Sequence, residues 1–194
     1  MIEIYTQHSE GVWFGVACTQ QRILASSFSS SQQETLRNIL GNVPFELPFQ
    51  VFNEPSAFAK NTFASLKNVY DGKQVSTRFS LALTRLPAYT QKVLKSTAQI
   101  PLGYVTSYGS IAKAVGGGPR AVGNVMASNP FAPIVPCHRV VKSDFTLGGY
   151  GLGLKIKIEI LSREKKGFCN SKEIDVNGRQ LEVFPVEYVL RHFV

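Results

Sequence analysis

Three consecutive glycines followed by a proline divide the second half of this 194-residue chain into short helical segments. Thr106 or Ser107 can start a helix over SYGSIAKAV (107–115), which the run Gly116–Gly118 would end. Pro119 suits the first position of a further helix, PRAVGNVMAS (119–128), because its missing N–H is unpaired there anyway. Two short helices joined by a glycine turn predict a helix-turn-helix, a pattern that many all-α proteins also contain without touching DNA.

Residues 1–70 contain short segments that are typical of strands and, after them, segments that are typical of helices. The runs MIEIYT (1–6), GVWFGVAC (11–18) and RILASSF (22–28) are rich in strand formers and separated by polar turn residues, which favours an antiparallel sheet. SSSQQETLRNIL (29–40) and the segment 56–70 place apolar residues at helical spacing. This part therefore predicts a small α+β unit.

The signals after Pro87 are less uniform. TQKVLKSTAQI (90–100) predicts a helix that Pro101 ends. LKIKIEI (154–160) alternates strictly, so by period alone it favours a strand. The tail from Gly167 has two strand-like runs flanking Asn177-Gly178, which predicts a β-hairpin.

Composition and charge limit the class of protein. Apolar residues make up 44% and charged residues 18%, an ordinary globular composition, and no apolar run approaches the roughly 20 residues of a membrane span. The amino terminus lacks a secretory signal pattern, so we expect a cytoplasmic location, or a nuclear one in a eukaryote. The net charge of +8 favours a polyanionic partner. The cysteines Cys18, Cys137 and Cys169 are too far apart to suggest a disulfide framework or a zinc site.

PCHRVV (136–141) places a cysteine beside a histidine in a stretch that is typical of buried, extended backbone. A thiol is mostly protonated at neutral pH, so an attacking cysteine needs a base. Consecutive side chains of an extended segment point to opposite faces, so we expect a bridging water between Cys137 and His138. The alternatives are a buried structural thiol, which most cysteines are, and a cysteine hydrolase, which leaves the helix-turn-helix and the basic charge unexplained.

Four ordered motifs between about Leu86 and Lys166 resemble the O6-alkylguanine-DNA alkyltransferase (methylated-DNA–protein-cysteine methyltransferase) family. They are the signature Pro136–Val140, the turn Asn129-Pro130, the helix start Arg120–Gly123 and the loop Gly148–Gly151. The resemblance implies an α+β chain of three parts. These are a ribonuclease-H-like amino-terminal domain with a small antiparallel sheet (1–85), a mainly helical DNA-binding and alkyl-acceptor domain with a helix-turn-helix (86–166), and an extension of unknown role (167–194).

The resemblance also implies a reaction, which is direct-reversal DNA repair. The alkyl group of O6-alkylguanine, and of O4-alkylthymine, in duplex DNA passes irreversibly to Cys137 after the base is flipped. Each molecule of such a suicide enzyme acts once. The expected partner is double-stranded DNA containing alkylated guanine, the protein is expected to be a monomer, and neither a membrane, a metal nor an organic cofactor is expected. The alternative is a base-flipping sensor of alkylation damage without transfer, but relatives of that kind lack the reactive cysteine.

By resemblance, four residues form the catalytic group. Cys137 is the nucleophile, His138 receives its proton through water, Glu164 orients the imidazole, and Asn129 ties the recognition helix to the cysteine loop. This arrangement requires a helix that delivers Glu164, so we expect a helix over 154–160 in spite of the alternation. SREKK around Glu164 is also typical of a solvated helix end.

The substrate pocket is likewise implied by the resemblance. Tyr108 presses the flanking phosphate and donates to the base, while Met126 and the loop at Tyr150 form its walls. A backbone N–H at Gly151, where much of the family has serine, donates to the guanine oxygen. The carbonyls of Cys137 and Val140 accept from the exocyclic amine.

Arg120 is expected to fill the gap left by the flipped base. The helix that follows it would lie in the minor groove, which accounts for its small residues Ala121, Gly123, Ala127 and Ser128. Gly123 costs helix stability relative to alanine, so something should approach it closely. The spacing alone leaves open whether this is a groove of DNA or another helix of the protein.

Overall fold

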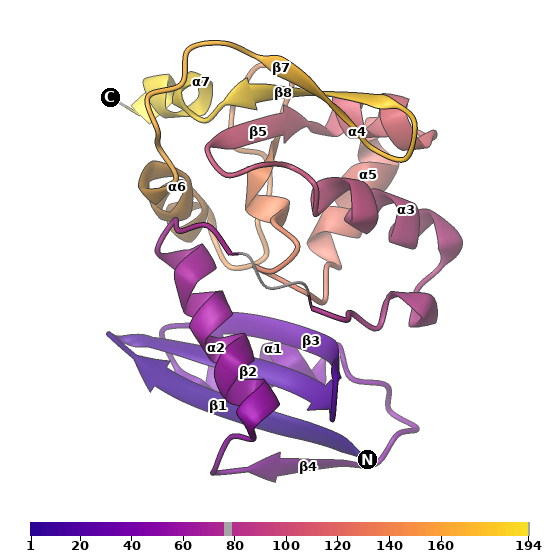
Figure 1. Ribbon diagram of the computed structural model, residues 1–194, viewed down its shortest axis with the longest axis vertical. Coiled ribbons are helices and arrows are strands. Elements are labelled where there is room, and N and C mark those ends of the chain that lie inside the picture. The colour runs from indigo at the N-terminus through magenta and orange to yellow at the C-terminus, as the bar shows by residue number, and fades with distance from the viewer. Residues whose placement is uncertain (76–78, 194) are drawn as a thin grey trace. The chain divides into compact units, whose positions relative to one another are not determined.

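The computed structural model describes residues 1–75 and 79–193 and has a mixed α+β fold (Figure 1). It consists of two compact units, each with its own sheet. Unit 1 holds Met1–Tyr70, Gln74–Arg85 and Pro130–Ile134, and unit 2 holds Asp71–Lys73, Leu86–Asn129 and Val135–Val194. The predicted domain boundaries and the ribonuclease-H-like assignment stay predictions. Among the described residues, no helix combines the length and apolar character needed to cross a bilayer.

Unit 1 is a four-stranded sheet of order β3-β2-β1-β4 with two helices. Its elements are β1 (Ile2–Ser9), β2 (Val12–Thr19), β3 (Arg22–Ser29), α1 (Gln32–Leu40), β4 (Phe49–Phe52), α2 (Ala57–Tyr70) and the 3-10 helix η1 (Leu83–Arg85). The three antiparallel strands and both helices confirm the sequence expectation. Strand β4, which pairs parallel to β1, was not predicted.

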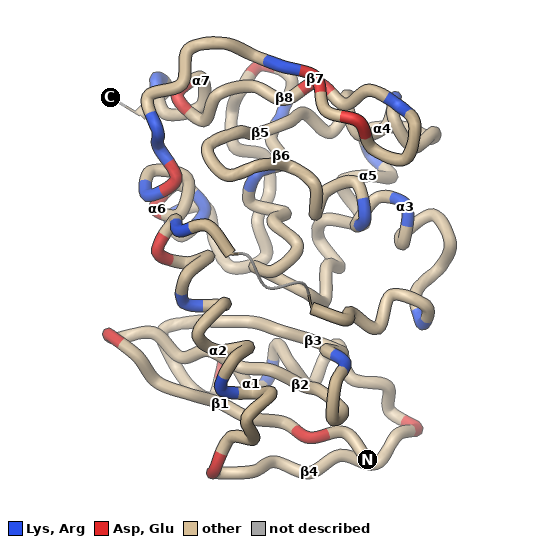
Figure 2. The backbone as a smooth tube through the Cα atoms, viewed as in Figure 1, with Lys and Arg blue, Asp and Glu red and all other residues tan. Residues whose placement is uncertain are grey.

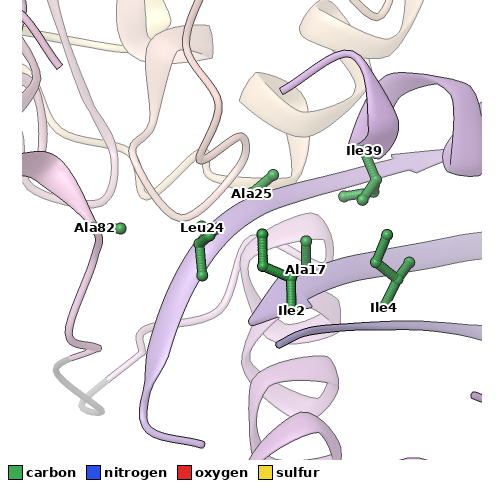
Figure 3. Packing of buried hydrophobic residues seen from close by; sticks show 7 residues of the cluster. All are labelled: Ile2, Ile4, Ala17, Leu24, Ala25, Ile39 and Ala82. Atoms are coloured by element: carbon green, nitrogen blue, oxygen red, sulfur yellow. The ribbon is translucent and has the colours of Figure 1, made fainter. Parts of the chain in front are cut away.

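The two helices of unit 1 cover opposite faces of its sheet (Figure 1). A Cβ at Gly15 would lie 2.6 Å from Thr35 of α1, whereas the neighbouring Phe14 contacts Tyr70 of α2. Successive strand residues point to opposite faces, so each helix has its own side. On the α1 side, the buried cluster includes Ile4, Ala17 and Ile39 (Figure 3).

Unit 2 has a four-stranded sheet of order β6-β5-β8-β7. Its elements are α3 (Ala88–Thr97), β5 (Tyr104–Ser107), α4 (Tyr108–Val115), α5 (Pro119–Ala127), η2 (Cys137–Arg139), β6 (Val140–Val141), α6 (Leu154–Arg163), β7 (Lys172–Asp175), β8 (Gln180–Pro185), α7 (Glu187–Leu190) and η3 (Arg191–Phe193). The expectation of a mainly helical unit missed this sheet. It forms because the tail returns to pair β8 with β5, which is a long-range contact.

Local signals placed several elements of unit 2 correctly. The side chain of Ser107 caps α4, and Pro119 occupies the first turn of α5. The hairpin β7–β8 turns at Asn177 and Gly178, as predicted. The segment 154–160 is part of helix α6, so its alternating period was misleading. Helix α3 ends at Thr97, three residues before the end expected from Pro101.

Candidate functional site

A cavity of about 620 Å³ in unit 2 gathers most of the residues singled out by sequence. The predicted residues that line it are Tyr108, Arg120, Gly123, Met126, Ala127, Cys137, Tyr150 and Gly151. They come from α4, α5, the 3-10 turn η2 and the glycine-rich loop before α6. Four further lining residues were not predicted from the sequence, namely Pro119, Lys142, Gly148 and Gly149.

Strand pairing brings the tyrosine and the cysteine to the same cavity. β5 pairs in parallel with β6, with Ser107 opposite Val141. Tyr108 directly follows β5. The 3-10 turn η2, which begins at Cys137, leads directly into β6. The cysteine segment is therefore not extended, contrary to the sequence expectation. The run Cys137–Arg139 turns as a 3-10 helix because the Val140 N–H closes back on the Cys137 carbonyl.

Helix α5 presents an open surface at its glycine. A Cβ added at Gly123 would meet no atom within 4 Å, so packing inside the described protein does not demand a glycine there. Gly123 also lines the cavity. Of the two explanations left open by the sequence, tight packing against another helix of this chain is therefore wrong, and approach by an outside molecule remains.

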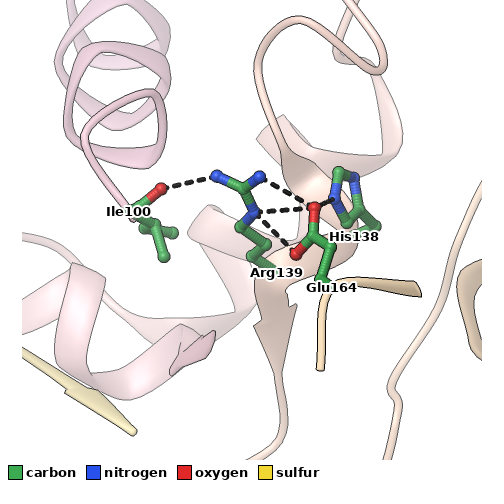
Figure 4. Close-up of polar contacts among 4 residues, drawn as sticks. All are labelled: Ile100, His138, Arg139 and Glu164. Atoms are coloured by element: carbon green, nitrogen blue, oxygen red, sulfur yellow. Dashed lines mark hydrogen bonds and ion pairs between the residues drawn. The ribbon is translucent and has the colours of Figure 1, made fainter. Parts of the chain in front are cut away.

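A buried carboxylate, Glu164, joins a histidine and an arginine side chain (Figure 4). Arg139 donates to both oxygens of Glu164, with Nε to Oε2 at 2.9 Å and Nη2 to Oε1 at 2.8 Å, and its Nη1 donates to the Ile100 carbonyl at 2.7 Å. His138 Nε2 lies 3.0 Å from Glu164 Oε1. Glu164 and His138 are both 0% exposed, so Glu164 does not belong to a solvated helix end.

The protonation states follow from these contacts. Burial alone would raise the pKa of Glu164, but the charges and hydrogen bonds of His138 and Arg139 lower it to about 2. Because Arg139 is permanently charged, it holds Glu164 as a carboxylate even beside a neutral imidazole. Burial lowers the pKa of His138 despite Glu164. A neutral His138 must donate from Nε2 to the carboxylate, which leaves Nδ1 as an acceptor.

The acceptor nitrogen of His138 is buried and has no hydrogen-bond partner among the described residues. The thiol that needs a base adjoins it in sequence. Cys137 is 5% exposed, and burial raises its pKa, while contacts with Asn129 and the charge of Lys157 act in the opposite direction. A raised thiol pKa makes proton removal a requirement for attack, and His138 Nδ1 is the ring nitrogen left to accept that proton.

Lys157 is a residue of the site that was not predicted from the sequence. It is 0% exposed, and its ammonium donates to the carbonyls of Val140 (2.7 Å), Leu147 and Gly149 (3.3 Å). Burial lowers its pKa to about 8. A helical reading of 154–163 offered the signal, because Lys157 shares one face with the buried Ile160 and Leu161. A lysine on an apolar face requires internal partners.

The glycine-rich loop needs one of its glycines for steric reasons. Gly148 has a φ of +64°, and a Cβ there would lie 2.8 Å from the Tyr108 hydroxyl oxygen. The loop thus passes directly over the tyrosine. Tyr150 is half-buried, but its hydroxyl is buried and has no partner among the described residues. Burial raises the pKa of this hydroxyl, and Cys137 acts in the same direction.

Six of the predicted site residues do not line the cavity: His138 and Glu164, described above, and four others. Asn129 Nδ2 donates to the Val135 carbonyl at 2.9 Å and so joins the end of α5 to the cysteine segment. The Val140 carbonyl accepts from Lys157. Ala121 is half-buried on α5, and Ser128 is exposed at its end. No group of three or more potential metal-ligating side chains comes together in residues 1–75 and 79–193.

Comparison with known sequences agrees with this geometry. Residues 88–166 match the family described as 6-O-methylguanine DNA methyltransferase, DNA binding domain. The methylated-DNA–protein-cysteine methyltransferase of Methanocaldococcus jannaschii is 42% identical over 102 residues, which is 53% of this chain and 60% of that protein. The enzyme of the same name from Pyrobaculum aerophilum is 55% identical over 65 residues, which is 34% of this chain and 44% of that protein. The chain thus spans about half the length of these curated relatives.

Solved structures match over more of the chain. The O6-methylguanine methyltransferase of Mycobacterium tuberculosis has a TM-score of 0.65 and 28% identity, covering 85% of this chain and 93% of that one. The Mycobacterium tuberculosis protein in complex with DNA gives a TM-score of 0.66, also at 28% identity, with 84% of this chain and 92% of that chain covered. The O6-methylguanine-DNA methyltransferase of Pyrococcus kodakaraensis gives a TM-score of 0.64 at 28% identity. The match covers 84% of this chain and 99% of that chain.

Proposed function

We propose that this chain belongs to the 6-O-methylguanine DNA methyltransferase family, whose DNA-binding domain residues 88–166 match, and that it repairs DNA by direct reversal. The alkyl group of O6-alkylguanine in duplex DNA, and by extension that of O4-alkylthymine, passes to Cys137. The observation that carries this proposal is the position of Cys137. Cys137 lines a cavity large enough for a base. The next residue, His138, begins a series of side-chain hydrogen bonds that runs through Glu164 to Arg139.

The proposed step is an in-line displacement. The proton of the Cys137 thiol passes through a bridging water to Nδ1 of His138, and Glu164 stabilises the resulting imidazolium. The sulfur forms a bond to the alkyl carbon while the bond from that carbon to O6 breaks. The electron pair remains on guanine, and the Tyr108 hydroxyl stabilises this anion by donating a hydrogen bond to it. The product is a thioether, and none of the described site residues is placed to cleave it, so each molecule acts once.

The reacting base must leave the stack before it can reach the thiol. In our proposal, helices α4 and α5 act as a helix-turn-helix, α5 lies in the minor groove, and Arg120 fills the gap. The exposed position of Arg120 at the cavity and the open surface of Gly123 support this docking. Within the pocket, Met126 packs against the base and the backbone N–H at Gly151 donates to O6.

Intact-mass measurement after incubation with duplex DNA containing methylated guanine tests the proposal. We expect a gain of one methyl group confined to Cys137, and no gain in Cys137→Ser, which should still prefer alkylated to unmodified duplex. Cys169→Ser is the matched control and should be methylated like the unaltered protein, because Cys169 lies outside the cavity. Preferential binding without any mass gain would favour the damage sensor instead.

A further inference from the structure

A second cavity in unit 2, of about 310 Å³, lies outside the site described above. It is formed by α3, the end of α4 and the turn of the β7–β8 hairpin. Lys92, Lys95 and Arg179 stand at its rim as exposed side chains, and the buried Ser96 lines it. Figure 2 shows basic positions along α3, along α4 and at the hairpin turn. We propose that this basic pocket binds a backbone phosphate of the DNA strand, which extends the contact surface beyond α5.

Ser96 supplies the first observation that points to a ligand. The residue is 0% exposed, and its hydroxyl oxygen has no hydrogen-bond partner in the described part of the chain. Buried hydroxyls nearly always have partners, so an unpaired one in a cavity wall calls for a group that completes it. A phosphate oxygen accepts a hydrogen bond from a hydroxyl and is attracted by the three cations at the rim.

The three basic side chains at the rim, Lys92, Lys95 and Arg179, form no ion pairs with carboxylates among the described residues. Asp175 is the acidic residue at the hairpin turn, and its Oδ1 already accepts from the Gly178 N–H at 3.1 Å. The turn holds Arg179 in place because Asn177 and Gly178 both have positive φ, the geometry of a tight hairpin.

A purely structural role would have the lysines compensate the negative end of α3. The last carbonyls of that helix are already paired within the chain. Ala98 N–H donates to Leu94, Gln99 N–H donates to Ser96, and the Gln99 side chain donates to Lys95. The ammonium groups of Lys92 and Lys95 are therefore available to a ligand.

The position of the pocket favours a DNA phosphate over a small phosphorylated molecule. Val115 lines the pocket, and Arg120 of α5 follows only five residues later. Five residues span at most about 17 Å, and one DNA strand carries a charge about every 3.4 Å along the axis. A strand that passes Arg120 thus has phosphates within reach of the pocket. This inference rests on the proposed function for its choice of nucleic acid.

Salt-dependent binding of undamaged duplex tests the pocket without requiring alkyl transfer. In K92Q/K95Q/R179Q, we expect weaker binding and a salt slope reduced in magnitude by about 1, since the loss of one phosphate contact removes about 1. The control R22Q/R37Q/K60Q removes the same charge from exposed residues of unit 1 and should keep the slope of the unaltered protein. Equal losses of slope in both variants would overturn the proposal.

Ser96→Ala separates a ligand role from a structural one. We expect inorganic phosphate to raise the thermal midpoint of the unaltered protein above its value in chloride of equal ionic strength, and Ser96→Ala to lose this gain without a lower midpoint in chloride. A lower midpoint in chloride with an intact phosphate response would refute the role of Ser96. A phosphate response combined with an unchanged DNA slope in the triple variant would assign the pocket to small phosphates and overturn the DNA proposal.

The failure of the proposed function would be visible separately. Methyl transfer to Cys137 is measured by mass on the same unaltered protein, and the triple variant keeps every residue of the first cavity. Absent transfer with a reduced salt slope in the triple variant would leave the pocket standing as a DNA contact. Normal methyl transfer by the unaltered protein, with an unchanged salt slope in the triple variant, would refute the proposed DNA contact at the pocket and support the repair function.

Discussion

Replacing Lys157 by methionine should slow alkyl transfer far more than it destabilises the fold. The change removes an ammonium that donates to the carbonyls of Val140, Leu147 and Gly149. Val140 and Leu147 are buried, so their carbonyls lose partners at about 1–3 kcal/mol each, or roughly 2–6 kcal/mol together. The carbonyl of Gly149, which belongs to an exposed residue, can turn to water.

The cost of burying the charged ammonium opposes this loss of hydrogen bonds. The pKa of Lys157 falls from 10.5 to about 8 through burial, which corresponds to a cost of about 3 kcal/mol for the charged form. Methionine removes that cost. The loss of hydrogen bonds and the removed cost of the buried charge together give a net effect between about 1 kcal/mol of stabilisation and about 3 kcal/mol of destabilisation at neutral pH. The transfer rate should nonetheless fall at least about tenfold, because the glycine-rich loop loses its anchor and the pKa of Cys137 loses the lowering effect of the ammonium.

The pH dependence of stability gives an independent check. Because the folded-state pKa of Lys157 lies below that of the unfolded chain, the unfolded state binds more protons between about pH 8 and 10.5. The free energy of unfolding contributed by this group therefore rises with pH through that window, and Lys157→Met should abolish this rise. Lys155→Met, an exposed position on the same helix, is the control and should leave the rate and the profile unchanged. Normal transfer by Lys157→Met would refute the anchoring argument.

Three further predictions concern the same unit. Glu164→Gln should cost about 3–5 kcal/mol in chemical denaturation because it leaves the largely buried guanidinium of Arg139 without its carboxylate, whereas Glu159→Gln should cost little. Since the folded pKa of Glu164 is lowered from 4.5 to about 2, its stabilisation should be lost as pH falls through that window, and a flat acid profile would contradict this. Gly148→Ala should cost at least about 1 kcal/mol through its positive φ and slow transfer by displacing Tyr108; an unchanged single-turnover rate would argue against this contact. Alkylated Cys137 should lower the thermal midpoint by about 2–4 °C per kcal/mol of overpacking, benzyl more than methyl, and a raised midpoint for both adducts would show that the pocket accommodates the product.

Local chemistry accounts for the parts of the fold that the sequence determined by itself. A serine that caps α4, a proline in the first turn of α5 and the pair Asn177-Gly178 act within a few residues of where they stand. Their effects depend on single backbone N–H groups and on φ, which distant contacts change little. The motif around Cys137 predicts the nucleophile only through its resemblance to a known family, and this role stays a proposal.

Long-range contacts decided the rest. Strand β4 joins its sheet only through β1, and β5 pairs with β6 and with β8 from the far end of the chain. The segment 154–160 alternates like a strand, yet it forms a helix because Ile160 and Leu161 bury one face against the unit. That burial also carries Lys157 and Glu164 into the interior, where each charge is held by its partners, the carbonyls of a loop and the side chains of His138 and Arg139. The family resemblance paired Glu164 with His138, but no pattern in the sequence specifies Arg139 or the carbonyls around Lys157 as partners, since they come from segments that only tertiary packing brings together.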